Sequence, residues 1–422
     1  MSDQRSGGLW SHPGFMKLWA ASAISDVGPQ VTMVALPLIA ALSLGATPWQ
    51  MGLLSAAGSA PILLVGLFAG VWVDRLRRRP LMIAADVGRA ALLLLIPFAA
   101  AAGTLRMEIL YVVALSTGAL SVLFDVAYLS LVPSLVGRDE LVEANGKLEV
   151  TASAAQVVGP GLGGTLIGTL GAAVAVMVDA VSFLVSALFL RGIPATEPRP
   201  AASGERVGVT AEIVEGLHAV AHHRILRALA VCSASTNLFG RMFLAVYVLY
   251  MTRDLGLDSV GVGLVFATGG VGALAGSLVV GATTRRLGPG PTMIWAQLVF
   301  GVTGLAVPLA VLMPRIALPL VVGSEFTQWM AIVVYYVSAV SVRQALVPDR
   351  LRGRVNATMR FLAGGAMPIG ALIGGALGGL IGLPWTLVAA ELGMLLGFVW
   401  LLLSPVRGLR ELPAGERETH GG

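Results

Sequence analysis

The chain has little charge and almost no cysteine. Only 12% of its 422 residues are Asp, Glu, Lys or Arg, about half the share of a soluble domain, while 56% are hydrophobic and the mean hydropathy is +0.84. Such sparse charge excludes a large solvated surface, and with it a soluble globular protein of this length. Cys232 is the single cysteine, which excludes an intrachain disulfide and indicates neither a redox pair nor a thiolate metal site. The composition predicts a polytopic membrane protein.

Further absences narrow the function. The sequence has no Gly-x-x-x-x-Gly-Lys-Ser/Thr loop, no soluble stretch large enough for an ATPase and no catalytic constellation. We therefore expect neither an enzyme nor a bound cofactor or metal, and any transport has to draw on a gradient. The net charge of +5 does not indicate a nucleic-acid partner, because the basic residues lie in short loops between apolar runs. The first fourteen residues lack a cleavable signal pattern, so the first apolar run is expected to remain as a span.

Twelve apolar segments are each long enough for the ~20 residues that cross ~30 Å of hydrocarbon. The predicted spans are 15–44, 51–73, 81–102, 108–131, 148–168, 172–191, 226–251, 259–283, 291–312, 316–342, 355–381 and 384–404. Arginines concentrate in the loops on the side that also holds both termini. By the positive-inside rule that side is cytoplasmic. The strong preference for arginine over lysine is common in GC-rich bacteria, so we expect a bacterial inner-membrane protein with both termini inside.

One long polar segment, 192–225, divides the spans six and six. The predicted domains are an N-terminal six-helix bundle (1–192), a cytoplasmic linker (193–225), a C-terminal six-helix bundle (226–405) and a cytoplasmic tail (406–422). From Ala211 the linker has a helical apolar face, which we expect to lie along the cytoplasmic membrane surface. His218, His222 and His223 in this stretch are interpreted as solvated interfacial side chains rather than as metal ligands.

The two halves repeat at an offset of 211 residues. Three residues of the first loop, Gly70, Leu76 and Pro80, fall on Gly281, Leu287 and Pro291. The same offset places Asp26 on Asn237 and Gln30 on Arg241, and Asp179 and Glu391 hold matching positions in spans 6 and 12. A near-constant offset across several regions indicates duplication. The predicted fold is an all-α membrane protein of twelve transmembrane helices in two six-helix repeats, a known transporter architecture.

The signature loop, residues 70–80, reads Gly-Val-Trp-Val-Asp-Arg-Leu-Arg-Arg-Arg-Pro. It resembles the loop between spans 2 and 3 of the major facilitator superfamily, Gly-x-x-x-Asp-Arg-x-Gly-Arg-Arg/Lys. The matching residues are Gly70, Asp74, Arg75, Arg78 and Arg79. Arg77 stands where the family has a second glycine, and in the second-half copy Arg285 stands where the acid would be.

Three further blocks are similar to bacterial macrolide-efflux and siderophore-export proteins of that superfamily. They are Phe124-Asp125-Val126-Ala127-Tyr128 with Leu131-Val132-Pro133, Arg343-Gln344-Ala345 through Pro348-Asp349-Arg350, and Arg354-Val355-Asn356-Ala357-Thr358-Met359-Arg360. Span 5 carries Gly159, Pro160, Gly163 and Gly164, which resemble the antiporter motif Gly-Pro-x-x-Gly-Gly. Ala155 departs from that motif, where another glycine is usual.

The resemblance implies that the signature loop is a conformational latch. Asp74 would dock near the start of span 11, around Arg354–Asn356, when the cytoplasmic side is closed. Arg75, Arg78 and Arg79 would pair with acids or lipid phosphates; the alternative is that these arginines only enforce topology. For the span-5 motif the alternatives are a helix that bends or seals a leak path, and ordinary packing of small residues.

Ionisable residues inside the spans need a partner or a water-filled cavity. They are Asp26, Asp86, Arg89, Asp125, Asp179, Arg241, Glu325 and Glu391. Asp86 and Arg89 lie one turn apart and are predicted to pair locally. We assign Asp125 to a gating network with Arg89 or the signature loop. Asp179 and Glu391, in spans that are peripheral in this architecture, are assigned to packing.

Spans 1, 4, 7 and 10 are expected to line the central cavity. The polar and aromatic residues that they offer are Asp26, Gln30, Asn237, Arg241, Glu325, Gln328, Trp329 and Tyr336. The last four share one face of span 10 at helical spacing. An acid among aromatic rings in a poorly hydrated cavity holds its proton more readily than one in water, as proton coupling requires. Glu325 and Asp26 are the candidates for that role; the alternative is a fixed salt bridge, with Arg241 as the partner.

These observations favour a proton-coupled exporter of small amphipathic compounds, such as drugs, secondary metabolites or siderophores, that works by alternating access as a monomer. A cavity with few charges and several aromatic and aliphatic side chains suits such compounds better than sugars or phosphates. Two alternatives stay open: an importer or facilitator of a small organic solute with the same fold, and a membrane sensor that transports nothing.

Overall fold

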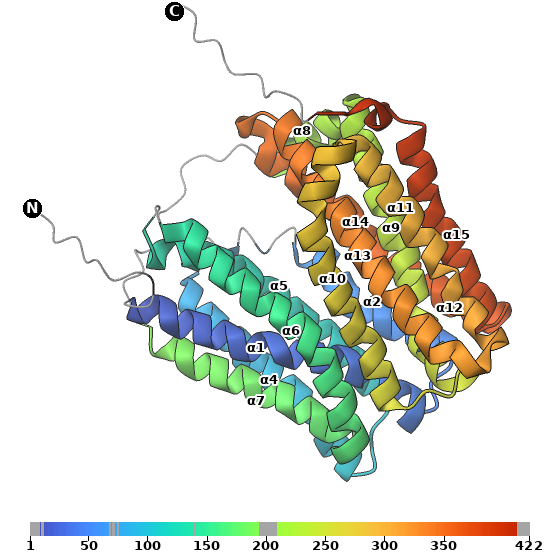
Figure 1. Ribbon diagram of the computed structural model, residues 1–422. Coiled ribbons are helices and arrows are strands. Elements are labelled where there is room, and N and C mark those ends of the chain that lie inside the picture. The colour runs from blue at the N-terminus through green and yellow to red at the C-terminus, as the bar shows by residue number, and fades with distance from the viewer. Residues whose placement is uncertain are drawn as a thin grey trace, which may run out of the picture. The chain divides into compact units, whose positions relative to one another are not determined.

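The computed structural model describes residues 9, 12–66, 69, 72–73, 76–137, 140–193 and 209–411 of the chain. In these ranges all regular secondary structure is helical (Figure 1). The chain forms two compact units, which are described separately. Unit 1 consists of Met1–Ala46, Ala57–Ala202 and Asp258–Ala267; unit 2 consists of Thr47–Ala56, Ser203–Leu257 and Thr268–Gly422. Each unit therefore includes a short segment from the other half of the sequence.

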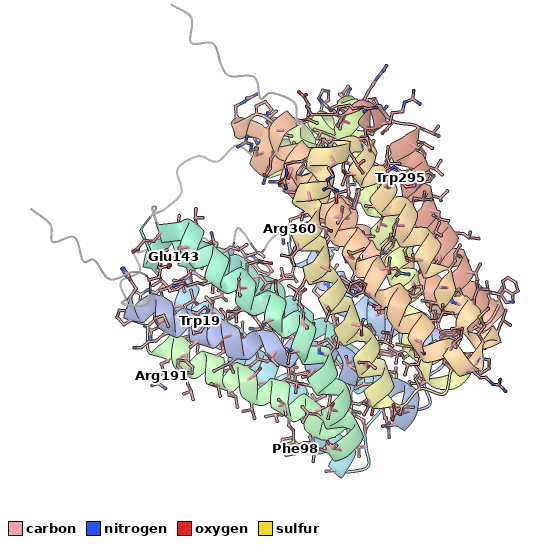
Figure 2. The ribbon with its side chains drawn as sticks, in the orientation of Figure 1. Trp19, Phe98, Glu143, Arg191, Trp295 and Arg360 are labelled. Atoms are coloured by element: carbon pink, nitrogen blue, oxygen red, sulfur yellow. The ribbon has the colours of Figure 1, made fainter. Side chains whose placement is uncertain are left out.

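Unit 1 is built around a central helix, α1. Its helices are α1 (Pro13–Leu38), α4 (Arg78–Ala101), α5 (Met107–Leu135), α6 (Leu141–Leu170) and α7 (Ala172–Arg191), while α2 (Pro48–Leu64) and α10 (Ser259–Leu287) contribute residues to both units. α1 packs against α6 and α7, and α4 packs against α5 and α7. Apolar residues of α1, α4 and α5 form the core. Figure 2 shows Glu143 and Arg191 at one end of this unit and Phe98 at the other, as expected for helices that alternate in direction.

The helices of unit 2 are α8 (Val209–His222), α9 (Arg224–Leu249), α11 (Pro289–Gly304), α12 (Ala306–Leu309), α13 (Ala317–Leu346), α14 (Asp349–Leu380) and α15 (Leu383–Leu402). The unit is centred on α9, which packs against α14 and α15. Short 3₁₀ turns follow α12 (Ala310–Leu312, Pro314–Ile316) and α15 (η7, Pro405–Gly408). The predicted span 291–312 is interrupted after Gly304. Pro308 lies four residues later, and its ring nitrogen cannot donate the helical hydrogen bond to the Gly304 carbonyl.

Matching details recur in the two units at the offset of 211 residues. Gly171 separates α6 from α7 with φ +87°, and Gly382 separates α14 from α15 with φ +86°; this left-handed backbone favours glycine. Gly171 thus turns the chain between the predicted spans 148–168 and 172–191. Both α1 and α9 end in one π-helical turn, at Ile39–Ser43 and Tyr250–Asp254. These paired features are what a duplicated chain would produce.

Ten of the described helical segments are long and apolar enough to cross a membrane, two fewer than the sequence predicts. α2 falls short because its described part has 17 residues. α6 has 30 residues, but its first turns carry Glu143, Lys147 and Glu149, and glycine and threonine dilute the rest. Polytopic membrane architecture is therefore clear, and the count of twelve stays a prediction.

The linker helix α8 packs on α14, and its predicted place along the membrane surface stays a prediction. Gly216 permits the close approach because it has no side chain: a Cβ there would lie 2.5 Å from Thr358 Oγ1 and 2.7 Å from the Arg354 carbonyl oxygen. Glu215 of α8 forms an ion pair with Arg354, and Val220 is buried in the apolar core of unit 2. A glycine contact, an ion pair and one buried valine thus hold α8 on α14, while Val214 and Leu217 on the same helix are exposed.

The three histidines of this region make different contacts. His223 caps α9, since its Nδ1 accepts a hydrogen bond from the Leu226 amide (3.3 Å). The rings of His218 and His222 stack with their centroids 3.8 Å apart. Across the described ranges there is no group of three or more histidine, cysteine or acidic side chains placed to hold a metal ion.

Candidate functional site

The signature loop is only partly visible. Gly70, Asp74 and Arg75 lie outside the described residues. Arg78 Nη1 donates to the Ser130 carbonyl of α5 (3.0 Å), and Arg79 donates to the carbonyls of Leu190 (2.9 Å) and Arg191 at the end of α7. Cations at the carboxyl ends of helices are favoured by the helix dipole. These two arginines therefore fasten α4 to the ends of two neighbouring helices.

The glycines of the span-5 motif let α6 approach two other helices of unit 1. A Cβ on Gly159 would collide with Gln30 of α1, and one on Gly163 would lie 3.1 Å from the Cα of Val31. On another side of α6, a Cβ on Gly164 would lie 2.8 Å from the Cα of Gly263 in α10. α6 runs through Pro160 as one helix. The motif thus packs small residues against α1 and α10, which was one of the two alternatives.

A buried ion pair lies in the centre of unit 1. Arg89 Nη2 pairs with Asp86 one turn before it, and Arg89 Nη1 donates to Ser121 Oγ (3.3 Å). The guanidinium also lies over two aromatic rings, 4.4 Å from the centroid of Phe124 and 4.0 Å from that of Phe183. Asp86 is completely buried and Arg89 nearly so. Three helices, α4, α5 and α7, are therefore joined around a single guanidinium.

Three acids of unit 1 come within electrostatic range of one another. Asp26 of α1 is half-buried, and its carboxyl interacts electrostatically with Asp125, Arg89 and Glu149. Asp125 and Glu149 are exposed. Our sequence reasoning missed Glu149, the second residue of predicted span 148–168. The repeat could have revealed it, because the offset of 211 residues places it on Arg360, a charge of opposite sign.

Asp179 is held by hydroxyl groups of unit 1. Its carboxylate accepts a hydrogen bond from Thr32 Oγ1 of α1, and Ser182 Oγ donates to its backbone carbonyl (2.8 Å). Gly28 of α1 makes room for it, because a Cβ there would collide with Asp179 Oδ1. This arrangement joins α1 to α7, in keeping with the packing role that we assigned to Asp179.

In unit 2, Glu325 is buried and bonded to two neutral donors. Its Oε2 accepts from Tyr247 Oη (3.0 Å) and its Oε1 from Trp329 Nε1 (2.8 Å). Among the described residues no cation pairs with it, so the expected alternative of a salt bridge to Arg241 was wrong. Helical spacing in the sequence places Glu325 on one face of its helix. It does not show that Tyr247 of the neighbouring helix α9 donates a hydrogen bond to it.

Gln328 does not share the open face of α13 with Trp329 and Tyr336. It is buried, and its Nε2 donates to Glu391 Oε1 of α15 (3.2 Å), whereas Trp329 and Tyr336 are 44% and 64% exposed. Glu391 itself is completely buried, its Oε2 makes no hydrogen bond among the described residues, and Gly304 of α11 leaves the space that its carboxyl occupies. The predicted four-residue face therefore divides into a buried polar pair and an exposed aromatic pair.

Arg241 lies near the middle of α9 with no hydrogen-bonding or ionic partner in the described part of the chain. The residues around it define its direction. Leu238 and Met242 contact Gly370 and Gly374 of α14, and the ring of Phe239 contacts Gly393 of α15. Arg241 is therefore turned away from both packing helices. Asn237, one turn earlier, uses its amide nitrogen to donate to the Ser233 carbonyl (2.8 Å), which leaves its amide oxygen available.

Comparison with known sequences shows what the chain is similar to. A family model described as transmembrane secretion effector matches residues 9–418. The multidrug efflux pump Tap of Mycolicibacterium fortuitum is 30% identical over 382 residues, 87% of this chain and 90% of that protein. The enterobactin exporter EntS of Escherichia coli O1:K1 / APEC is 28% identical over 384 residues, 88% of this chain and 87% of that protein.

Solved structures with the same fold are transporters. A mutant of the nucleoside transporter NupG has a TM-score of 0.76 at 11% identity, covering 92% of this chain and 98% of that one. A bacterial homologue of the iron transporter ferroportin has a TM-score of 0.70 at 19% identity, covering 94% and 99%. At these identities the likeness is one of fold.

Proposed function

Since the chain belongs to the transmembrane secretion effector family of the major facilitator superfamily, we propose that it exports small amphipathic compounds by alternating access, driven by protons. It is a transporter rather than an enzyme. Its similarity to a multidrug efflux pump and to a siderophore exporter supports export of drug-like or siderophore-like cargo. The proposal includes twelve spans in two six-helix halves, a monomer, and both termini on the cytoplasmic side of a bacterial inner membrane.

The observation that carries proton coupling is the environment of Glu325. A carboxyl group that is buried with two neutral donors and no cation is more stable as the neutral acid than as the anion. It releases its proton only when water or a cation reaches it. Such a group can therefore bind a proton in one conformation and release it in another. Asp26, beside Asp125 and Glu149 in unit 1, is the second candidate.

The direction of transport is tested in cells of an exporter-deficient bacterial host with a panel of drugs and catechol siderophores. We expect cells that make the protein to accumulate less of at least one compound than cells with the empty vector. Increased uptake would identify an importer or facilitator instead. Purified protein that binds a compound in vesicles but moves nothing would identify a sensor.

Arg241 supports a narrower proposal about the cargo. A charged side chain near the middle of a span costs roughly 2.5–3.5 kcal/mol. Arg241 has no ionic partner among the described residues, so an anionic group of the cargo is the natural candidate to offset that cost. Asn237 on the same side of α9 offers an acceptor for a hydroxyl or N–H group of the same cargo. We propose that the exported compounds carry an acidic group, such as a carboxylate or an ionisable catechol, that binds Arg241.

Arg241→Gln is therefore expected to raise the apparent KM for an acidic cargo roughly tenfold, since one charge-assisted hydrogen bond is lost. The KM for a neutral cargo should not change. Initial rates in vesicles measure both. Arg315→Gln, an exposed arginine in the turn before α13, is the matched control. Equal effects on acidic and neutral cargo would contradict this role of Arg241.

The conformational latch at Asp74, with Gly70, Arg75, Arg78 and Arg79 around it, also belongs to the proposal. Asp74→Asn is expected to reduce the transport rate severalfold without changing the amount of protein in the membrane, because only one of the two conformations loses an interaction. Transport assays alongside quantitative immunoblots of membranes would show this. Normal transport by the variant would remove the latch.

A further inference from the structure

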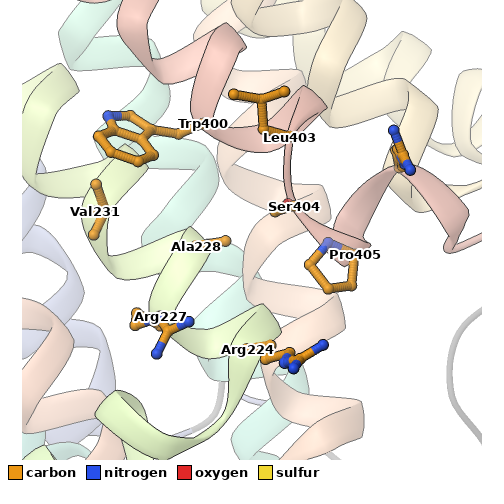
Figure 3. Close-up of a pocket in the computed structure, with 9 residues that line it drawn as sticks. Arg224, Arg227, Ala228, Val231, Trp400, Leu403, Ser404 and Pro405 are labelled. Atoms are coloured by element: carbon orange, nitrogen blue, oxygen red, sulfur yellow. The ribbon is translucent and has the colours of Figure 1, made fainter.

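A basic pocket of about 630 Å³ lies in unit 2, where the start of α9 meets the end of α15 (Figure 3). It was not expected from the sequence, which indicated no role for Arg224 or Arg227 and placed Arg407 in the tail. Its lining residues are Arg224, Arg227, Ala228, Val231, Trp400, Leu403, Ser404, Pro405 and Arg407. Three of them are arginines and none is acidic.

The basic part of the pocket carries positive charge that no acidic lining residue offsets. Arg224 and Arg227 stand one turn apart at the amino end of α9, so their charges repel each other and add to the positive end of the helix dipole. No acidic residue lies in that first turn. Arg227 Nη1 donates to the Ala221 carbonyl (3.3 Å), while Arg224 and Arg407 make no hydrogen bond or ion pair with the described residues. An anion bound here would stabilise all three guanidinium groups.

The other part of the pocket is apolar. Figure 3 shows Trp400 and Val231 at the end of the pocket opposite Arg224 and Arg227. Trp400 is 49% exposed and Leu403, beside it at the end of α15, is 74% exposed. In a membrane-spanning helix such exposed apolar side chains meet acyl chains. The pocket therefore suits a ligand with an anionic head and an apolar tail.

Two tryptophans of α15 indicate the depth of the pocket in the membrane. Trp385 and Trp400 lie near the two ends of this helix, and both are largely exposed. Fifteen residues of α-helix separate them, about 22 Å, which is most of the ~30 Å thickness of the hydrocarbon layer. Tryptophan is enriched at both membrane interfaces. The pocket lies at the Trp400 end, where the phosphates of one leaflet are found.

We propose that this pocket binds an anionic phospholipid of the cytoplasmic leaflet, with the headgroup phosphate held by the arginines and an acyl chain along Trp400 and Leu403. The loop arginines place this end of the helices on the cytoplasmic side. Basic pockets between transmembrane helices on that side are suited to anionic headgroups. A free phosphate ion would use the arginines but leave the apolar wall without a partner.

The test compares the stability of the purified full-length protein in detergent with added lipid. Phosphatidylglycerol is expected to raise the Tm of the protein, and phosphatidylcholine at the same concentration to leave it unchanged. In Arg224→Gln/Arg227→Gln the half-maximal phosphatidylglycerol concentration should rise roughly tenfold, because each basic residue contributes to binding an anionic lipid. Arg285→Gln/Arg286→Gln, two exposed arginines at the end of α10, lose the same charge and should respond as the unchanged protein does.

Further measurements distinguish a lipid from a free anion and control for misfolded variants. A second variant, Trp400→Ala, should weaken the response to phosphatidylglycerol while retaining all arginines. An equal Tm increase from inorganic phosphate would overturn the proposal in favour of a simple anion site. An undiminished response in Arg224→Gln/Arg227→Gln would place the lipid elsewhere, as would an equal loss in both double variants. Tryptophan fluorescence quenching by brominated phosphatidylglycerol provides a binding readout that does not depend on Tm.

Discussion

Glu325→Gln is expected to abolish proton-driven accumulation of cargo while leaving cargo exchange intact. Glutamine keeps the size of the side chain and can still accept a hydrogen bond from Tyr247 or Trp329, but it cannot bind and release a proton. Since coupling free energies are typically about 1–3 kcal/mol, accumulation driven by a pH gradient should fall by about 5- to 150-fold. Exchange of labelled for unlabelled cargo at equal pH on both sides should continue, and the rate should lose its dependence on pH.

Glu391→Gln tests whether this effect is particular to Glu325. Glu391 is also a buried carboxyl of unit 2 without a cation among the described residues, and the charges of the two carboxyls act on each other, but its one hydrogen bond is to Gln328 and its role is assigned to packing. If packing is its only role, this variant retains pH-driven transport. The prediction fails for Glu325 if Glu325→Gln still accumulates cargo against a pH gradient. If Asp26→Asn also does so, neither candidate carries the proton.

Arg89→Met is expected to destabilise the protein by about 3–5 kcal/mol, the usual cost when one partner of a buried ion pair is removed. The variant would leave Asp86 with an uncompensated carboxylate and would remove the contacts with the rings of Phe124 and Phe183. A large fall in Tm in detergent, with loss of the monodisperse peak in size-exclusion chromatography, would show this. Arg89→Lys should recover only part of the loss, because an ammonium group cannot stack as a guanidinium does.

A second change distinguishes loss of the ion pair from loss of volume. In Asp86→Asn/Arg89→Met both charges are absent, so most of the lost stability should return. Arg106→Met, at the exposed start of α5, is the control for removing an arginine and should leave Tm unchanged. A wild-type Tm for Arg89→Met would show that the buried pair contributes nothing.

The helices themselves could largely be predicted from the sequence, since hydropathy and glycine turns are local properties. The predicted span 172–191 coincides with α7, and Gly171 before it has the left-handed backbone that glycine favours. The local pair of Asp86 and Arg89 also follows from helical spacing alone. The exception among these local predictions is the span 291–312, which is interrupted after Gly304.

What could not be predicted depends on a second helix. The sequence pattern of α8 does not show that this helix packs on α14; that contact depends on Gly216 and on the residues of α14 opposite it. The sequence places Gln328 on a face of α13, but its burial depends on the hydrogen bond to Glu391 of α15. The basic pocket likewise needs α9 and α15 together, so no single helix pattern indicates it.

The segments that the two units exchange have a consequence for biosynthesis. Unit 1 requires residues 258–267, so it cannot be completed until the ribosome has passed well into the second half of the chain. Until then the Gly164 side of α6, which receives Gly263, is uncovered in the membrane. Unit 2 in turn needs 47–56, which are made long before the rest of it. The contact between Gly164 and Gly263 can therefore form only after synthesis has passed the start of α10.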